Sequence, residues 1–247
     1  GLRRLRGLGS KSVHELHQHF LKQIRSLLLP RLGFGSYPEA FLSVNPERYL
    51  TNLVNDYLLK DIFTGSLVRS PDDVKRLLLE LTSEIGKTLS ILQLATRLHL
   101  SRQTVQRYLD LLETIFVIFS VPTYCTDPIK EVNKSRKYYF WDTGVINALQ
   151  RVWVVSEKRH DIHALWENWV MAEIWKKSRT FNRQEELFFW QSRNGSTVEL
   201  VVQQGTVLHP FHLRFDPHGT YPSRAFERTY GIKPQIIHPE NVLKFIL

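Results

Sequence analysis

The 247-residue sequence contains one cysteine, Cys125, and one methionine. A single cysteine cannot form a disulfide within the chain, which excludes a disulfide-rich secreted scaffold and favours a reducing compartment. Long apolar runs are also lacking, because the longest, residues 114–121, falls far short of the roughly 20 residues that a membrane-spanning helix needs. The first residues do not form the apolar segment of a secretory signal. We therefore predict a soluble, cytoplasmic protein with no membrane partner.

Signatures of nucleotide and metal binding are missing as well. Gly86-Lys87-Thr88 resembles the end of a phosphate-binding loop, but the glycine required five residues earlier is replaced by Leu81. Such a loop also follows a strand, whereas the apolar spacing here predicts a helix. Two groups of histidines, His14 with His17 and His19, and His209 with His212, lack a cysteine or carboxylate at ligand spacing. From its own residues the chain is expected to hold no cofactor, neither ATP nor a metal ion.

Positive charge is what the sequence has in excess. Lysine and arginine number 33 against 24 acidic residues, a net charge of +9. Residues 1–31 hold seven of these cationic residues and a single acidic one. A basic segment attracts nucleic acid or an acidic partner, and it is equally compatible with a solvated surface. Hydrophobic residues make up 43% of the chain, which is enough for a globular core.

Helix start signals, and a change in the character of the sequence after about residue 150, divide the chain into three parts. Asn45-Pro46 and Ser70-Pro71 each place a capping side chain before a proline in the first helical turn. Apolar residues then recur at helical spacing. We predict an α+β fold with a helical segment over residues 1–63, a winged helix-turn-helix over residues 64–150, and a small mixed α/β domain over residues 151–247.

The middle part has the pattern of a helix-turn-helix. Ser90 and Ser101 each precede a short amphipathic segment, and His99-Leu100 forms the turn between them. The first turns of the second helix present polar side chains that can reach phosphates and base edges in a major groove. The predicted DNA contacts on this helix are Ser101, Arg102, Gln103, Thr104, Gln106 and Arg107.

Two β-rich segments follow, residues 116–124 and residues 137–141, as the two strands of a wing would. Lys134, Arg136 and Lys137 lie in or beside them and complete the predicted DNA contacts. Because winged helices also mediate protein contacts, a protein-interaction role is the alternative for this part.

The C-terminal part begins with a helix over residues 161–177 that is apolar nearly all round and is expected to be buried. Several strands are predicted to follow it, over residues 187–190, 197–202, 206–215, 234–237 and 242–247. Glu167 lies in the helix, Glu199 on one strand, and His212 and Arg214 on the next. Since alternate residues of a strand share one face, Glu199 is expected to meet His212 and Arg214 across the hairpin.

Five blocks of the sequence are distinctive. They are Tyr37-Pro38-Glu39-Ala40, Tyr57-Leu58-Leu59-Lys60-Asp61-Ile62, the run from Thr104 to Glu113, Lys137-Tyr138-Tyr139-Phe140-Trp141-Asp142-Thr143-Gly144, and Leu165-Trp166-Glu167-Asn168. In this order they resemble the C-terminal region of a large family of prokaryotic AAA-type ATPases, over about residues 10–247. Members of that family have a P-loop ATPase domain, then a winged helix, then a domain similar to the PD-(D/E)XK restriction-endonuclease fold. The resemblance implies a fragment without its ATPase core. DNA and its own ATPase domain, which would bring ATP and magnesium, are then the expected partners.

The resemblance also implies roles for four residues. Magnesium-dependent nucleases of this fold use three carboxylates and a lysine. Glu167 matches the helix acid and Glu199 stands where the family has aspartate, but His212 replaces the expected glutamate and Arg214 the expected lysine. Neutral histidine is a poor magnesium ligand, and arginine does not exchange a proton near neutral pH. The resemblance therefore predicts a degenerate site with no catalytic residue.

Together these patterns predict a DNA-associated module, with a winged helix that contacts DNA and a nuclease-like domain that does not cut it. One alternative is a protein-interaction or assembly module of the ATPase. The other is a metal-dependent nuclease that tolerates the two replacements.

Overall fold

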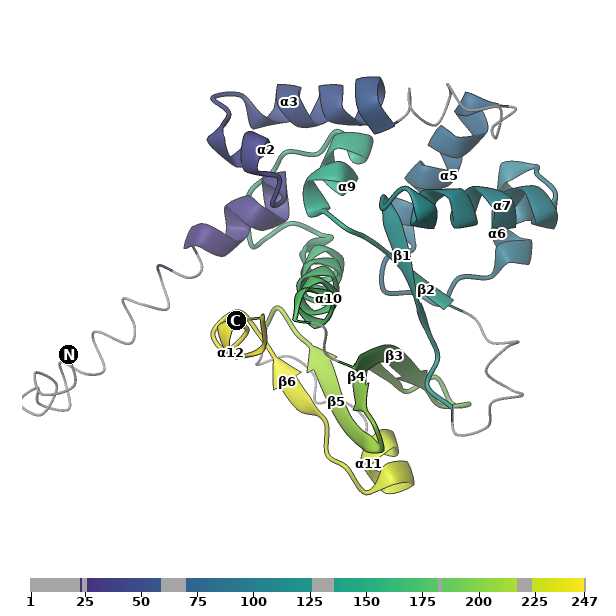
Figure 1. The fold of residues 1–247 in the computed structure, drawn as a ribbon, viewed down its shortest axis with the longest axis vertical. Coiled ribbons are helices and arrows are strands. Elements are labelled where there is room, and N and C mark those ends of the chain that lie inside the picture. The colour runs from purple at the N-terminus through teal and green to yellow at the C-terminus, as the bar shows by residue number, and fades with distance from the viewer. Residues whose placement is uncertain are drawn as a thin grey trace, which may run out of the picture.

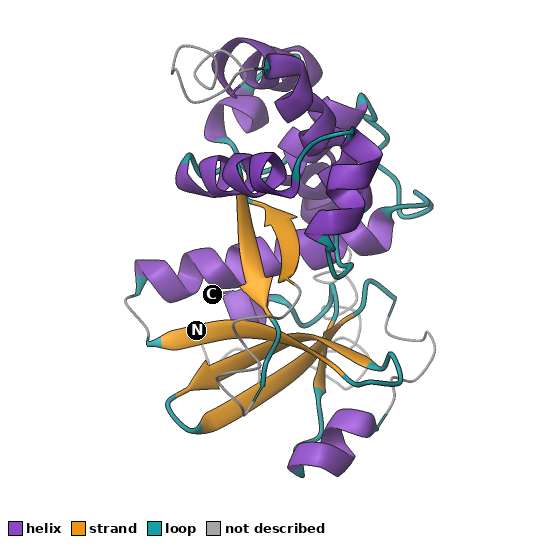
Figure 2. Cartoon of the chain, turned by 90° about the vertical axis from the view of Figure 1, so that its right-hand side faces the viewer, coloured by secondary structure: helices purple, strands orange, loops and turns teal. Residues whose placement is uncertain are grey.

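The computed structural model describes residue 23 and residues 26–58, 70–125, 136–181, 184–216 and 224–246 (Figure 1). Over these residues the fold is α+β, as predicted, with many helices and two small sheets. One sheet has two strands, and the other has four in the order β3-β4-β5-β6. Figure 2 shows most of the helices at one end of the molecule and the four-stranded sheet at the other, with the two-stranded sheet between them.

The first helices lie in the upper left part of Figure 1, with α3 along the top and α2 beneath it. Residues 26–34 are helical, and they are followed by three further elements: α2 (Pro38–Leu42), α3 (Pro46–Asn52) and the π-helical η2 (Leu53–Leu58). Asn45 provides the predicted cap, because its Oδ1 accepts a hydrogen bond from the Arg48 N–H at 2.9 Å. The helix predicted after Asn45-Pro46 is therefore confirmed.

Three helices pack together next: α5 (Pro71–Ser83), α6 (Ile91–Leu98) and α7 (Arg102–Thr114). A serine begins each of them, since Ser70, Ser90 and Ser101 accept backbone N–H bonds at 3.4, 3.4 and 3.0 Å. His99 ends α6 with a φ of 57°, in the left-handed region, and this turns the chain sharply into α7. The predicted pair of helices and the turn between them are present.

A two-stranded antiparallel sheet follows, made of β1 (Ile118–Pro122) and β2 (Arg136–Phe140). These strands occupy the two β-rich segments that the sequence predicts. Leu89, just before α6, adds a bridge at the edge of this sheet by donating its N–H to the Arg136 carbonyl at 2.9 Å. After β2 the chain enters α9 (Thr143–Gln150), which Asp142 caps by accepting the Gly144 N–H at 2.7 Å.

The C-terminal part consists of a long helix and the four-stranded sheet. The helix is α10 (Ile162–Thr180), and the strands are β3 (Glu185–Gln191), β4 (Thr197–Gln204), β5 (Val207–Leu213) and β6 (Gln235–Ile237). β4 pairs antiparallel with both β3 and β5, and β6 pairs in parallel with β5 after the short helix α11 (Ala225–Tyr230). The long helix and the first four strands predicted for this part are confirmed.

The strand predicted over residues 242–247 is wrong, because the chain there forms the helix α12 (Leu243–Ile246). A short apolar run does not distinguish a strand from a buried helix. Asn241 decides the outcome, since it accepts the His238 N–H and donates to the Ile236 carbonyl, both at 2.8 Å, and so turns the chain after β6. The Ile246 N–H then bonds to the Val242 carbonyl at 3.2 Å within the helix.

One hydrophobic core runs through both ends of the described structure, from Leu28 to Val242. Asn168 on α10 clamps the end of β2, because its side chain accepts the Phe140 N–H at 2.8 Å and donates to the Phe140 carbonyl at 2.9 Å. A bridge between Thr123 and Phe189 joins the two sheets. The middle and C-terminal parts therefore share their interior. Among the described residues, the helices are all too short or too polar to cross a membrane.

Candidate functional site

The first candidate site is the start of α7, where the predicted DNA contacts lie. Its outward side chains, which we call the α7 polar face, are Arg102, Gln103, Thr104, Gln106 and Arg107. All of them are exposed except Thr104, which is half-buried. They project to the surface because Val105, Leu109 and Leu112 turn the opposite side of the helix into the core.

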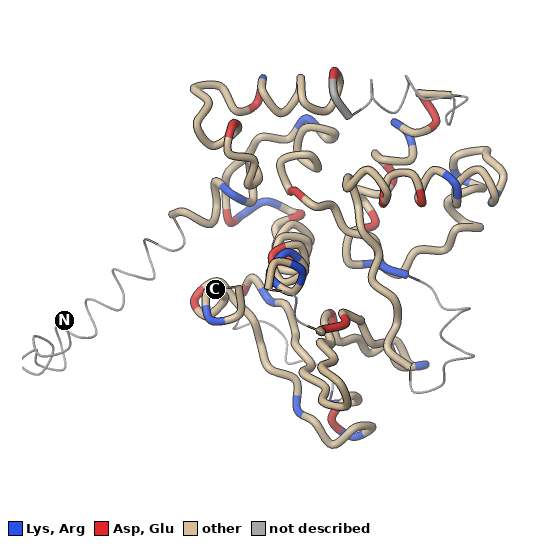
Figure 3. Tube along the Cα trace, in the orientation of Figure 1, with Lys and Arg blue, Asp and Glu red and all other residues tan. Residues whose placement is uncertain are grey.

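The charge of α7 is uneven along its length. Arg102 and Arg107 lie in its first half, whereas Asp110 and Glu113 come later, toward β1, as the blue and red segments in Figure 3 show. The first turn also carries the positive end of the helix dipole. The Ser101 hydroxyl caps the helix and bonds to the Thr104 hydroxyl at 2.8 Å, so both groups are already engaged. The N-terminal end of α7 is therefore the cationic end.

The three cationic residues predicted to contact DNA near the wing lie in different surroundings. Arg136 is exposed, and its guanidinium donates to the Ser120 hydroxyl at 2.9 Å. Lys134 lies outside the described residues. The prediction for Lys137 is wrong, because its side chain is buried with the residue 2% exposed, too deep to touch DNA. Successive side chains of a strand point to opposite faces, so Arg136 faces solvent while Lys137 faces α10.

The second candidate site is the buried cluster around Glu199, on β4. Glu199 Oε2 lies 2.8 Å from His212 Nδ1, and its Oε1 accepts a hydrogen bond from Arg214 at 2.9 Å. The antiparallel pairing of β4 with β5 brings these residues together, as predicted. We assign the proton to His212 Nδ1, because the carboxylate is an acceptor. The other ring nitrogen, Nε2, is buried without a hydrogen-bond partner among the described residues.

Electrostatics keep Glu199 ionised. Burial by itself raises the pKa of this carboxyl, but the hydrogen bond from His212 and the positive charge of Arg214 lower it by more. The net result is a pKa below its usual value. Glu199 is thus a carboxylate whose negative charge is compensated from two sides.

Glu167, on α10, lies close to the same cluster but has other partners. Its Oε1 accepts a hydrogen bond from the Tyr139 hydroxyl at 2.7 Å and lies 3.3 Å from Lys137 Nζ. Tyr139 is fully buried, and burial, the charge and hydrogen bond of Glu167, and the charge of Glu199 all raise its pKa well above 10. Because both carboxylates act on this one phenol, Tyr139 connects Glu167 to the Glu199 group.

Lys137 and Tyr139 are members of this cluster that sequence reasoning missed. The signal was available, because residues 137 and 139 share one face of β2 by alternation. What the sequence left open was which face turns inward. Gly86, in the turn after α5, also lies close to this cluster, because a Cβ atom added to it would lie 2.8 Å from Glu167 Oε2.

The magnesium ion that the resemblance implies does not fit these residues. His212 and Arg214 contact the two oxygens of Glu199, and Lys137 and Tyr139 both contact Oε1 of Glu167. Over the described part of the chain, no group of three or more His, Cys, Asp or Glu side chains is placed to hold a metal ion. The two carboxylates, Glu167 and Glu199, are balanced by the two cations, Lys137 and Arg214. This balance of charge suits a structural contact between α10, β2 and the four-stranded sheet.

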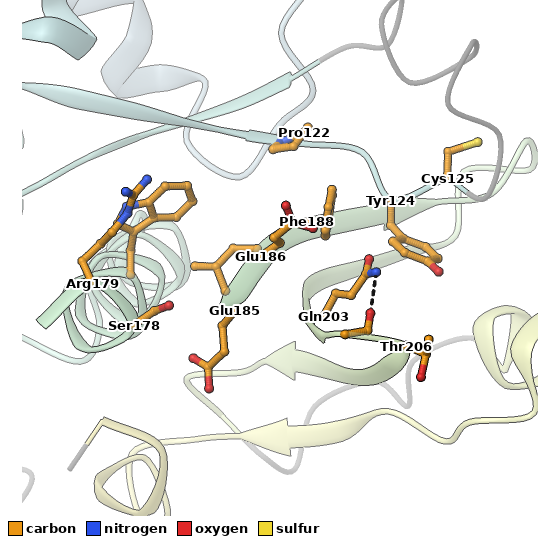
Figure 4. Close-up of a pocket in the computed structure, with 13 residues that line it drawn as sticks. Pro122, Tyr124, Cys125, Ser178, Arg179, Glu185, Glu186, Phe188, Gln203 and Thr206 are labelled. Atoms are coloured by element: carbon orange, nitrogen blue, oxygen red, sulfur yellow. Dashed lines mark hydrogen bonds between the residues drawn. The ribbon is translucent and has the colours of Figure 1, made fainter. Parts of the chain in front are cut away.

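A cleft of about 980 Å³ lies between the C-terminal end of α10, the strand β3 and the turn that follows β4 (Figure 4). Ser178 and Arg179 of α10 stand on one side of it, and Tyr124 and Gln203 on the other. None of the residues predicted as DNA contacts or nuclease-like positions lines this cleft.

Comparison of the sequence with known proteins identifies a family to which it is similar. The family model described as a domain of unknown function (DUF8612) matches residues 26–154, just over half of the chain. An uncharacterized protein of Mycobacterium tuberculosis and another of Mycobacterium bovis are each 22% identical over 209 residues. Each match covers 80% of this chain and 46% of the relative, so the chain spans about half the length of these curated relatives. No solved structure matches the chain at a significant level.

Proposed function

The chain belongs to the family of this domain of unknown function, DUF8612, and from its surfaces we propose that it is a DNA-associated module. In this proposal α5, α6 and α7 with β1 and β2 act as a winged helix, and the α7 polar face enters a major groove. The four-stranded sheet and α10 act as a nuclease-like domain without cleavage activity.

The α7 polar face is the observation that carries the proposal. Its exposed side chains are cationic or amide groups, and the first acidic residue of the helix is Asp110. Arginine and glutamine are side chains that bond to base edges and phosphates. The sharp turn at His99 leaves the first turns of α7 accessible, as readout by a recognition helix requires.

The compensated charges of the buried cluster support the second half of the proposal. A nuclease of the implied kind needs free carboxylate oxygens for magnesium. Here the Glu199 oxygens bond to His212 and Arg214, and Glu167 bonds to Tyr139. The cluster therefore favours a domain that positions DNA or stabilises the module over one that cuts.

A salt titration with duplex DNA tests the proposal. Arg102→Ala with Arg107→Ala should weaken binding and reduce the slope of log K against log salt by about 0.9 for each lost phosphate contact. The matched control is Arg193→Ala with Arg228→Ala, which removes the same charge from exposed positions in the β3–β4 turn and α11. The control should keep most of the affinity. Equal binding by both double variants, with unchanged melting temperatures, would refute the role of α7.

A protein-interaction module is the second candidate, and an apolar surface favours it. Phe41, Leu42 and Val44, in and after α2, are all largely exposed. Exposed apolar patches are typical of protein contacts. We propose that the partner is a P-loop ATPase domain of the kind that the sequence resemblance implies. The double variant Phe41→Ser with Leu42→Ser should then no longer capture that ATPase domain in a pull-down, and its DNA binding should be unchanged. Undiminished capture would contradict this candidate.

A further inference from the structure

A groove of about 790 Å³ lies between β1, the C-terminal end of α7 and the second half of α10. We call it the β1 groove. Its floor is aromatic, because Phe119 packs against Trp141 and Trp175 with ring centroids 4.8 and 5.3 Å away. Phe116 extends this cluster to the surface, with its ring centroid 6.1 Å from that of Trp141. The volume is in the range of clefts that hold small organic ligands.

Phe116 is unusual in its backbone and in its exposure. It follows α7 with a φ of 57°, in the left-handed region where glycine is the usual residue. The cap itself is formed by backbone bonds alone: the Phe116 N–H bonds to the Glu113 carbonyl, and the Val117 N–H to the Leu112 carbonyl. The residue is 70% exposed, so neither the cap nor the core requires its side chain. An aromatic ring in a strained position facing water points to a contact with a ligand.

Cations surround this aromatic floor. Arg136, Lys176 and Arg179 line the groove together with one carboxylate, Glu113. The Arg179 guanidinium lies 5.6 Å from the centre of the Trp175 ring. Exposed aromatic rings beside a cationic edge are how proteins hold single-stranded nucleic acids, with bases stacked on the rings and phosphates against the cations.

We propose that the β1 groove binds unpaired nucleotides of a single nucleic-acid strand. A base stacks on Phe116, and Arg136 and Arg179 hold the flanking phosphates. This site is separate from the α7 polar face, because Arg107, the last residue of that face, comes six residues before Glu113 of the groove, about 9 Å along the helix at 1.5 Å per residue. The proposal therefore does not depend on duplex binding.

Fluorescence anisotropy of the whole chain with labelled 12-nucleotide oligothymidylate and oligouridylate tests it. Phe116→Gly should raise the Kd about 5- to 150-fold, as expected for one stacked base. The melting temperature should stay the same or rise, because glycine is the natural residue at a left-handed cap. Phe116→Asn, which also tolerates this conformation, should behave alike.

Two controls separate this groove from other surfaces. Phe41→Ala removes another exposed aromatic ring, on α2, whose centre lies 5.6 Å from the Arg31 guanidinium. This variant should leave the Kd unchanged. Arg179→Gln should reduce the salt slope by about 0.7 if it removes one phosphate contact. A preference for oligothymidylate or for oligouridylate identifies DNA or RNA as the source of the strand.

The outcomes distinguish the two proposals. If Arg102→Ala with Arg107→Ala weakens duplex binding only, and Phe116→Gly weakens single-strand binding only, both sites are supported. If duplex binding is absent but Phe116→Gly still weakens single-strand binding, the β1 groove stands and the α7 proposal fails. No binding of either oligonucleotide, or equal binding by wild type and Phe116→Gly, would overturn the groove.

Discussion

Glu199→Gln removes a charge from the buried cluster and keeps the shape of the side chain. Glu199 accepts hydrogen bonds from His212 and Arg214 at 2.8 and 2.9 Å. A hydrogen bond to a charged group contributes roughly 1.5–3 kcal/mol, and the glutamine keeps one acceptor oxygen. The Arg214 share is the smaller, because its side chain is 31% exposed and water screens the pair. We therefore expect the free energy of unfolding to fall by about 2–3 kcal/mol, and the melting temperature by roughly 4–12 °C.

The pH dependence of this loss is a sharper test. The pKa of Glu199 is lower in the folded protein than its usual value of 4.5. Such a carboxyl stabilises the fold at pH values above its unfolded pKa and loses this contribution as the pH falls through the folded pKa. The difference between wild type and Glu199→Gln should therefore be full at neutral pH and shrink below pH 4.5.

Urea unfolding followed by tryptophan fluorescence at several pH values measures both effects, since the chain has six tryptophans. Glu186→Gln is the matched control, because Glu186 is an exposed carboxylate on the neighbouring strand β3. The control should unfold like the wild type at each pH. A Glu199→Gln chain as stable as wild type at neutral pH, or one with the same deficit at every pH, would refute this account of the cluster.

Three further predictions concern the implied nuclease and nucleotide sites. His212→Glu with Arg214→Lys restores the set of three carboxylates and one lysine. The double variant should bind magnesium in calorimetry even if it does not cleave plasmid DNA, because cleavage also needs a placed water and substrate. Magnesium-dependent cleavage by the unaltered chain would contradict the non-catalytic assignment. Gly86→Ala should lower the free energy of unfolding by more than about 1 kcal/mol, because φ is 76° and the new Cβ would meet Glu167 at 2.8 Å; a wild-type melting temperature would show that the turn relaxes. Calorimetry should detect no saturable ATP binding, since Lys87 follows α5 and its ammonium donates to the Ser83 carbonyl at 2.7 Å; micromolar affinity that Lys87→Ala abolishes would reveal a site.

Local signals predicted the helices and most strands of the C-terminal part. Ser70, Ser90 and Ser101 begin helices because capping depends on residues three positions apart. Alternation also brought Glu199 together with His212 and Arg214. The sequence did not reveal how α10 docks on β2, because that contact joins residues about thirty positions apart. Alternation places Lys137 and Tyr139 on one face of β2, but only this docking determines that the face is buried.

The clamp of Asn168 on the backbone of Phe140 has a consequence for a chain cut between them. The connecting segment contains Val154 and Val155 on the surface, where a protease can reach it. Cleavage there would leave α9 and β2 in one fragment and α10 with the four-stranded sheet in the other. Because their contacts include two buried hydrogen bonds and a common core, the two fragments should stay together as a noncovalent complex and reassemble after separation. Cutting the peptide bond in this segment would therefore leave the folded structure intact.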